Sequence, residues 1–503
     1  MPDPFDLPVV LLSHRGPVTF DTGEAGRTAT RGAGGLVTAL TGLTAHLDEA
    51  VWVCVASGGE DAVVAAEAGG APVRLALEGE ARLLGPDEPQ LEREVGLRLV
   101  AVPDDVHTPF YGTIANPLLW FVQHRLYGLA TSPQLGREER AAWDDGYVTA
   151  NRLAADAVVE EVERHGGRVA VFLHDYHFYL VGQMVRDRCP GVVLSHFVHI
   201  PWPGPDSWRV LPPSLREPVL QGLLGCDVVG FHTEGDARSF LLCVQELLGL
   251  PVDLDGLFVT VPGGRRVRAR QYPISIDVDA LEEVAYSDAA EVHMATLPAD
   301  GQLLLRVDRT DPSKNIVRGF VAYELMLEEH PELHGQVVFL ALLQPSRQDV
   351  QEYADYLTEI GAAATRVNAR FGTGDWQPVD LRLASDMPLA AAAYRRCDVL
   401  VVNAVADGMN LVAKEAVVVN EHDMVLALSE ATGAHGELGW FAVTLHPFDV
   451  GQQADALHEA LTMPRQQRRD LREAAASIVR HNDVARWLRA QLEDLTEVEG
   501  GQG

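Results

Sequence analysis

The segment from Asp407 to Glu415 carries groups that could bind a sugar nucleotide. It follows an apolar run at 398–402, typical of a buried parallel strand, and leads into a helical stretch at 416–419. The start of a helix attracts anions because its first N–H groups lack partners and its dipole is positive there. Asp407, beside this turn, could bind sugar hydroxyls, and Glu415, a turn or two later, could bind a ribose.

Two cations follow the apolar run at 303–307, which we expect to be the first strand of a second domain. Arg309 and Lys314 lie five residues apart across a turn that Pro312 helps to set. Together they would suit a diphosphate, which Arg can grip with two hydrogen bonds and Lys as a point charge. The spacing fits a solvated basic turn equally well. Arg347 ends the next strand, and taken alone it is more typical of a surface residue.

Polar groups also end several strands of the first half of the chain. The run at 169–173 ends in His174, Asp175 and His177, and the run at 192–199 ends in His199 before two prolines. Such polar groups cost desolvation energy unless they bind something, so this region is a candidate ligand site. The first strand, at 8–12, leads to Arg15.

Two further features of the first half have weaker signals. The glycine-rich loop at 32–36, which includes Gly34 and Gly35, precedes a helical pattern and would let backbone N–H groups approach a phosphate or a sugar. Such a run is more often only a turn. Tyr111 and Trp120 lie nine residues apart, and one ring could stack on a sugar while the tyrosine hydroxyl binds phosphate. From spacing alone, a role in the core is the better interpretation of this pair.

Strand-like runs alternate with helical patterns along most of the chain, which indicates βα units on parallel sheets. The runs that we expect to form strands are 8–12, 51–55, 97–102, 169–173, 192–199, 228–231, 303–307, 337–341, 398–402 and 425–428. Helical patterns include 150–164, 312–329 and 465–495, and the tail at 497–503 is predicted to be disordered. The sequence therefore predicts an α/β protein with two doubly wound domains, divided near residue 275 and facing a cleft, with ligands at the carboxyl ends of the strands.

Composition argues against nucleic acid and membranes as partners and favours a cytoplasmic location. The 503 residues carry a formal charge of -32, which argues against binding to nucleic acid or to an anionic membrane. No apolar run approaches the length that spans a membrane, and the acidic N-terminus is not typical of a signal peptide. The five cysteines form no C-x-x-C pair and no Cys/His spacing typical of zinc, so we expect reduced, buried thiols in a cytoplasmic protein.

The order of these motifs resembles that of the trehalose-6-phosphate synthase family of retaining glycosyltransferases, over roughly residues 8–490. The shared motifs are His-Asp-Tyr-His at 174–177, His-Ile-Pro-Trp-Pro at 199–203, the Arg-x-Asp run from 306 to Ser-Lys at 313–314, and Asp-Gly-Met-Asn-Leu-Val-Ala-Lys-Glu at 407–415. The resemblance implies two Rossmann-like domains in the GT-B arrangement, 1–275 for the acceptor and 276–483 for the nucleotide sugar. It also implies a C-terminal helix at about 484–498 that returns to the first domain. No cofactor and no catalytic metal are expected.

The resemblance further implies transfer of glucose from GDP- or UDP-glucose to glucose-6-phosphate, which gives α,α-trehalose 6-phosphate. The implied donor-binding residues are Gly34, Gly35, His199, Arg309, Lys314, Asp407, Gly408, Met409, Asn410, Leu411 and Glu415. The implied acceptor-binding residues are Arg15, Tyr111, Trp120, Asp175 and Arg347, which reverses the core interpretation of the two aromatic residues. Arg309, Lys314, Asp175 and His199 are the expected catalytic group. No carboxylate is a convincing nucleophile, so the resemblance implies front-face retention, in which the leaving phosphate accepts the acceptor's proton.

Three positions depart from the family pattern. Val53 to Ser57 stand where the family often has a second Trp, Asn315 stands where it usually has Gly, and His14 stands where many members have Asn. Related glucosylglycerol-phosphate synthases and pseudo-glycosyltransferases of the validoxylamine-phosphate type are alternatives, and so is a non-catalytic sensor of sugar phosphates. The choice between GDP and UDP stays open, although the chain looks most like the actinobacterial-type branch, and a homo-oligomer is compatible with the family.

Overall fold

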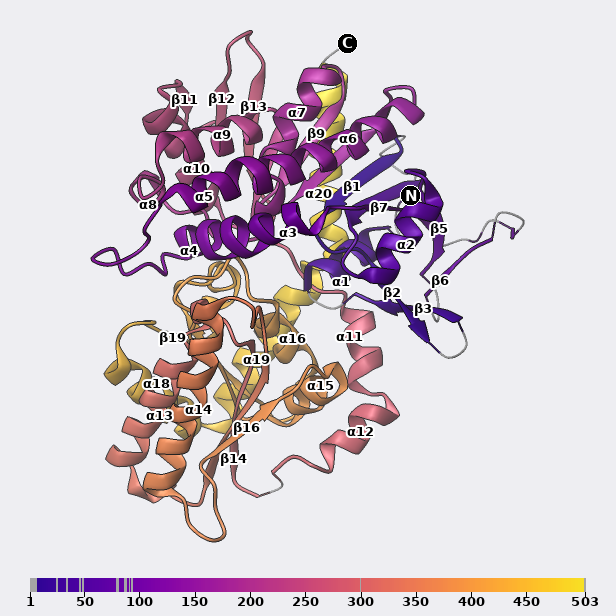
Figure 1. Cartoon of the computed structure of the whole chain (residues 1–503). Helices are drawn as coiled ribbons and strands as arrows, with labels where there is room; N and C mark the ends of the chain where they lie inside the picture. The colour runs from indigo at the N-terminus through magenta and orange to yellow at the C-terminus, as the bar shows by residue number, and fades with distance from the viewer. Residues whose placement is uncertain are drawn as a thin grey trace. The chain divides into compact units, whose positions relative to one another are not determined.

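A computed structural model of the chain describes residues 7–23, 26–32, 35–44, 47, 49–77, 81–85, 88–89, 91, 94–298 and 300–501 (Figure 1). The chain divides into two compact units. Unit 1 comprises Met1–Ile274 together with Val484–Gly503, and unit 2 comprises Ser275–Asp483.

Unit 1 is built on an eleven-stranded sheet within the described residues, in the order β11-β12-β13-β10-β9-β8-β1-β4-β7-β5-β6. The strands are β1 (Val9–Ser13), β4 (Ala50–Val55), β5 (Val73–Ala76), β6 (Arg82–Leu83), β7 (Glu94–Val100), β8 (Ala170–His174), β9 (Val193–Phe197), β10 (Val228–Phe231), β11 (Val252–Asp253), β12 (Phe258–Thr260) and β13 (Arg266–Gln271); β2 (Val18–Gly23) and β3 (Gly26–Arg31) form a separate hairpin. The seven strands from β13 to β7 are parallel, and the outer strands pair antiparallel. The strand order reverses between β1 and β8, where doubly wound sheets bind ligands.

The helices of unit 1 connect these strands and cover the sheet. They are α1 (Gly35–Thr44), α2 (Gly59–Ala68), α3 (Asp104–Pro109), η1 (Phe110–Leu119), α4 (Trp120–Gln123), α5 (Arg137–Ala141), η2 (Ala142–Val148), α6 (Thr149–Arg164), η3 (Tyr176–Phe178), α7 (Val181–Arg188), α8 (Pro205–Trp208), α9 (Pro213–Leu224), α10 (Glu234–Leu248) and the C-terminal α20 (Val484–Gly501). The α20 helix packs on β9 (Figure 1). The Trp487 ring meets the Phe197 ring edge-on at 5.3 Å.

The prediction of a disordered tail at 497–503 is wrong for the residues up to 501. Helix α20 continues through Gly501, and Glu497 accepts a hydrogen bond from Arg268 of β13 at 2.9 Å. Asp494, one turn earlier, lies 3.4 Å from the guanidinium of Arg270. Contacts with β13 stabilise this helical end, and local composition cannot reveal them.

Across the part of unit 2 that the structure describes, the sheet has six strands, all parallel, in the order β16-β15-β14-β17-β18-β19. The strands are β14 (Gln302–Arg309), β15 (Val337–Gln344), β16 (Val379–Leu383), β17 (Val399–Val402), β18 (Val425–Ser429) and β19 (Val443–Leu445). The helices are α11 (Val278–Ala285), α12 (Asp288–Met294), η4 (Pro312–Lys314), α13 (Ile316–Glu329), η5 (Pro331–Leu333), α14 (Gln351–Phe371), α15 (Met387–Arg396), α16 (Leu411–Val419), α17 (His435–Leu438), η6 (Gly439–Phe441), α18 (Val450–Thr462) and α19 (Arg465–His481). The order reverses between β14 and β17, so the turns after these two strands leave the sheet side by side.

The predicted alternation of strands and helices in two α/β domains is confirmed, although several boundaries move. Strand β9 ends at Phe197, so His199 lies in the following loop and not in the strand. Strand β14 runs to Arg309, because its pairing with β15 continues to Gln344. The predicted helix at 312–329 is two helices, divided at Asn315, whose φ of 59° lies in the left-handed region.

The prediction of buried cysteines is confirmed for four of the five. All five cysteines are free, and four of them are buried, while Cys189 is partly exposed. Among the described residues, no helix combines the length and the apolar character that crossing a membrane requires.

Candidate active site

In unit 2, Asn410 links the turn after β17 to the first turn of α16. Its side-chain oxygen accepts the N–H of Ala413 at 3.1 Å, and its side-chain nitrogen donates to the carboxylate of Asp407 at 3.1 Å. The residue adopts a φ of 80°, which Asn tolerates better than most side chains. The helix therefore begins at Leu411, with the carboxylate of Asp407 fixed beside its N-terminus.

A second loop holds the backbone of this turn. The N–H of Gly433 donates to the Asp407 carbonyl at 3.0 Å, and the N–H of Ala434 donates to the Met409 carbonyl at 2.8 Å. The loops approach so closely that a Cβ added at Gly433 would lie 1.9 Å from the Gly408 carbonyl oxygen, which makes glycine a requirement. The turn is thus held before any ligand arrives.

The ammonium group of Lys314 forms an ion pair with the carboxylate of Asp407. Both side chains are largely buried, with 14% and 15% of their surfaces exposed. Lys314 ends the short helix η4, whose start is capped by the Asp311 side chain, which accepts the N–H of Ser313 at 3.0 Å. The alternative of a solvated basic turn is therefore wrong for Lys314.

The departure at Asn315 has a structural reason. Its left-handed backbone is one that glycine adopts readily, but the asparagine side chain adds two hydrogen bonds. Its nitrogen donates to the carbonyls of Asn403 at 2.9 Å and Pro447 at 2.6 Å. The residue therefore ties the turn after β14 to the end of β17.

A buried carboxylate, Asp308, lies among the cations of this turn. Its oxygen lies 3.6 Å from the guanidinium of the fully buried Arg306. Burial raises the pKa of Asp308 to about 6, although Arg306 and Lys314 oppose the shift. Burial also disfavours the charge on Lys314, but Asp407 and Asp308 outweigh it, so the pKa of Lys314 is raised. Arg309, half-buried at the end of β14, adds positive potential to both groups.

Glu415 lies on α16, one turn after the helix begins at Leu411. Its carboxylate accepts a hydrogen bond from the Tyr394 hydroxyl at 3.0 Å. Burial raises the pKa of Glu415, and the hydrogen bond partly opposes this shift. The preceding Lys414 is buried and pairs with Glu437 of α17 at 2.5 Å, so its charge serves the packing of α16.

Arg347 is not the surface residue that its local sequence suggests. Its side chain is only 6% exposed, and its guanidinium lies 3.5 Å from the fully buried carboxylate of Asp311. It also donates to the hydroxyl of Tyr353, which itself donates to Asp311 at 3.2 Å. The backbone at Arg347 has a φ of 50°, so a tertiary contact outweighs its local preference.

In unit 1, Asp175 follows β8 in an unusual backbone conformation with a φ of 72°. The residue is 9% exposed, and its N–H donates to the Phe197 carbonyl of β9 at 2.8 Å. His196 bonds the Asp175 carbonyl at 3.2 Å. A non-glycine residue held in this region by its surroundings is common at functional sites.

Rings from three separated segments stack in series near the β1–β8 reversal. Tyr111 stacks on His14 at 4.8 Å between ring centroids, and His14 stacks on His177 at 4.5 Å. His14, which departs from the family pattern, is thus an aromatic platform here. Trp120 is buried and stacks on His124 at 4.0 Å, while Arg15 is exposed directly after His14.

His199 lies in a cluster of histidines close to β9. Its Nε2 is 3.1 Å from Nδ1 of His174, and its ring lies 5.6 Å from that of His232. Burial, together with these neighbours, holds the pKa of His199 well below its usual value, and burial lowers the pKa of His174 to about 3. Both rings are therefore neutral at physiological pH and act as hydrogen-bond partners.

Residues 8–497 match Glycosyltransferase family 20. The chain belongs to this family. It is 29% identical to an alpha,alpha-trehalose-phosphate synthase [UDP-forming] of Pichia angusta, over 97% of this chain and 99% of the relative. It is 30% identical to a synthase of the same name from Emericella nidulans, over 97% of this chain and 92% of that relative.

Solved structures agree with this membership of glycosyltransferase family 20. An E. coli structure with bound UDP-2-fluoro glucose matches with a TM-score of 0.80 and 27% identity, over 97% of this chain and 99% of that one. A Burkholderia xenovorans alpha,alpha-trehalose-phosphate synthase (UDP-forming) in complex with glucose-6-phosphate matches with a TM-score of 0.79 and 26% identity. The match covers 97% of this chain and 99% of that one. The predicted family, the two-domain α/β fold and the enzyme class are confirmed.

For this family 20 enzyme, the structure brings Arg309, Lys314 and Asp407 together around Asp308 in unit 2. Glu415 lies on α16 against Tyr394. Of the two predicted glycines, Gly35 is the first residue of α1, while Gly34 lies outside the described residues. Asp308 and Tyr394 were missed. Asp308 lies in the Arg-x-Asp motif and could have been found, whereas Tyr394 carries no local signal of its contact with Glu415.

Proposed function

We propose that this chain transfers glucose, with retention, from a nucleotide-diphosphate glucose to glucose-6-phosphate, which forms α,α-trehalose 6-phosphate. The observation that carries the proposal is the Lys314–Asp407 ion pair, placed at the N-terminus of α16 and near Arg309. The names of the Pichia and Emericella relatives support it, as do the sugar-nucleotide analogue and the glucose-6-phosphate in the E. coli and Burkholderia structures.

In this proposal, unit 2 binds the donor. Arg309 and Lys314 neutralise the departing diphosphate, and Asp407 binds glucose hydroxyls. Gly408, Met409, Asn410 and Leu411 supply the backbone of a helix N-terminus, where N–H groups and the helix dipole favour diphosphate oxygens. Glu415 binds the ribose.

The acceptor is assigned mainly to unit 1. Arg15, Tyr111 and Trp120 bind its phosphate, together with Arg347 of unit 2, and Asp175 binds its hydroxyls. These roles are supported by the exposure of Arg15 and by the strained backbone at Asp175. Gly35, the first residue of α1, is assigned to the donor, and His199 contacts the donor glucose as a neutral ring.

The proposed reaction breaks the bond between the anomeric carbon and the diphosphate oxygen. The acceptor hydroxyl adds on the same face of the sugar, and its proton goes to the leaving phosphate. Positive charge develops on the sugar and negative charge on the phosphate, so catalysis depends on positioning and on the two cations. Asp407 and Asp175 serve as hydroxyl ligands, and neither acts as a nucleophile.

The decisive experiment offers UDP-glucose and GDP-glucose separately, each with glucose-6-phosphate, and measures nucleotide release and the disaccharide product. Because the named relatives are UDP-forming, we expect release of UDP to be at least as fast as release of GDP. A glycerol phosphate acceptor tests the glucosylglycerol-phosphate alternative, and a cyclitol nucleotide donor tests the pseudo-glycosyltransferase. Binding of both substrates without nucleotide release would favour the sensor and overturn the proposal.

A further inference from the structure

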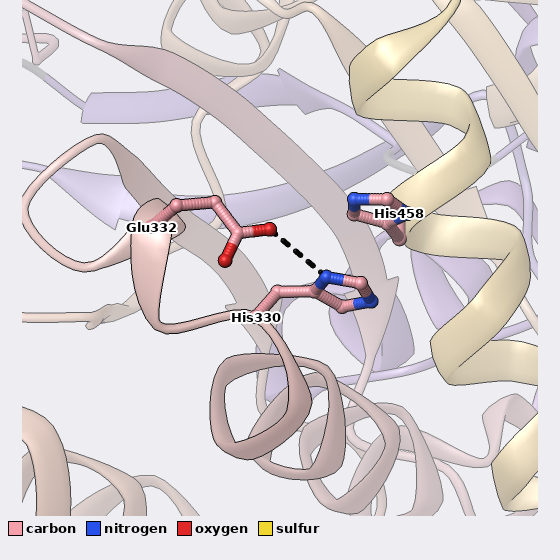
Figure 2. A group of neighbouring side chains, drawn as sticks. All are labelled: His330, Glu332 and His458. Carbon is pink, nitrogen blue, oxygen red and sulfur yellow. Dashed lines mark hydrogen bonds and ion pairs between the residues drawn. The ribbon is translucent and has the colours of Figure 1, made fainter.

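Two histidines and a glutamate of unit 2 meet outside the residues assigned to the donor. His330 directly follows α13, Glu332 lies two residues later in η5, and His458 lies on α18. Figure 2 shows the Glu332 carboxylate directed at the His330 ring, with the His458 ring next to it. Helices α13 and α18 pack together, which brings His458 to His330 from far along the chain.

The donor atoms are already close. Nδ1 of His330 lies 3.0 Å from Oε1 of Glu332, and one nitrogen or oxygen from each residue lies within 4.8 Å of the others. The two imidazole rings stack with their centroids 3.6 Å apart and an angle of 6° between their planes. His330 is 27% exposed and Glu332 is 65% exposed, so an ion can reach the group from solvent.

Two imidazoles and a carboxylate are a donor set that suits borderline transition metals. Zinc in proteins is bound by His nitrogen and carboxylate oxygen at about 2.0–2.2 Å, which places tetrahedral ligands roughly 3.3 Å apart. The 3.0 Å between His330 and Glu332 is near this value. Mg²⁺ and Ca²⁺ prefer oxygen ligands, so a site with two imidazole nitrogens is poorly suited to them.

Because the two imidazole rings are stacked, binding of a metal ion to both of them requires a change in ring orientation. A histidine lone pair lies in the plane of its ring, so two parallel rings cannot both point at one ion. One ring must turn about its side-chain torsions, which partial exposure permits. The ion then replaces the proton shared by His330 and Glu332, and that proton leaves to solvent.

We propose that His330, Glu332 and His458 form a binding site for a divalent transition-metal ion such as Zn²⁺, with water in the remaining position. The ion joins the end of α13 to α18, two helices that already pack together in the native unit. Because the unfolded chain does not hold these residues together, bound metal raises the stability of unit 2. The site is assembled by the fold, which is why no spacing of Cys and His residues along the chain predicted it.

The test uses the full chain without an affinity tag, stripped with chelator and dialysed. Isothermal titration with Zn²⁺ should give one site with a dissociation constant on the order of micromolar, and the melting temperature should rise when free Zn²⁺ is about 100-fold above that constant. Co²⁺ should give the absorption of a tetrahedral complex. His458→Ala should weaken binding at least about tenfold, and so should Glu332→Gln, which alters a mostly exposed side chain and keeps the ring stack.

The matched control is His446→Ala, which removes a histidine paired with an exposed glutamate, Glu430, at 3.8 Å. No second histidine completes that pair among the described residues, so Zn²⁺ binding should be unchanged. Circular dichroism confirms that each variant is folded. Equal binding by the wild type, His458→Ala and Glu332→Gln, or binding at millimolar Zn²⁺ only, overturns the proposal.

Discussion

The ammonium of Lys314 is ion-paired with the carboxylate of Asp407, and this contact joins the turns after β14 and β17. The two strands are hydrogen-bonded neighbours, so the fold itself brings the charges together. The carboxylate keeps the lysine charged and positioned before a ligand arrives. A diphosphate at the start of α16 would then meet a cation that needs little rearrangement.

We expect Lys314→Ala to lower kcat by roughly a hundredfold or more, because a preorganised charge donor of this kind is worth ~3 kcal/mol of barrier. Steady-state kinetics with saturating donor and acceptor measures the effect. Arg318→Ala is the control, since Arg318 is an exposed cation close in the chain that donates to Asn315 at 2.9 Å. It should keep near-normal activity. Near-normal turnover in Lys314→Ala would remove the leaving-group role.

The substitution Glu415→Gln should weaken donor binding by roughly 10- to 100-fold, since hydrogen bonds to a charged group are worth about 1.5–3 kcal/mol. Titration of the free nucleotide diphosphate measures the loss without catalysis. Tyr394→Phe removes only the hydroxyl that donates to Glu415 and should have a smaller effect. If the dissociation constant is unchanged in Glu415→Gln, the ribose lies elsewhere.

Local patterns predicted the parts of the site that depend on strand order. Arg309 ends one strand, Lys314 follows it and Asp407 follows another, and parallel strands of a doubly wound sheet present their carboxyl ends at one edge. The pairing of Lys314 with Asp407 follows from that rule. The same rule predicted the cluster at Asp175. The predicted strand at 192–199 was two residues too long, because β9 ends at Phe197 and His199 lies in the loop that follows.

Contacts between distant segments could not be predicted in this way. Nothing near Arg347 in the sequence indicates that its guanidinium is buried against Asp311, because that contact depends on a left-handed turn after β15. The stack of Tyr111, His14 and His177 also joins three separated segments. Periodicity describes one element at a time, whereas these features depend on how elements meet.

For Arg347, the expected effect is on the acceptor. Arg347→Ala should raise KM for glucose-6-phosphate at least tenfold and leave KM for the donor nearly unchanged. It should also destabilise the fold by about 3–5 kcal/mol, because Asp311 is left buried without its cation. Arg347→Lys, which keeps the charge, separates the two effects, since it should recover stability more than acceptor binding.

Tyr353→Phe is the matched control for this cluster. It removes the hydroxyl that donates to Asp311 at 3.2 Å and should cost about 1 kcal/mol of stability without changing either KM. An unchanged KM for glucose-6-phosphate in a folded Arg347 variant would show that the phosphate binds elsewhere.

The last prediction concerns Asp308, the buried carboxylate close to Arg306 and Lys314. The pKa of Asp308 is about 6 in the folded chain, against about 3.9 when unfolded, so the folded state binds the extra proton between these values. The stability that protonation gives is full below about pH 4 and is lost as the pH rises through about 6. The Asn side chain of Asp308→Asn cannot ionise. The free energy of unfolding of this variant, minus that of the wild type, should therefore increase by about 2–3 kcal/mol between about pH 4 and pH 7 and stay constant above about pH 7. Urea unfolding of both proteins across this range measures the difference, and a difference independent of pH would show that the carboxyl has its ordinary pKa in the native fold.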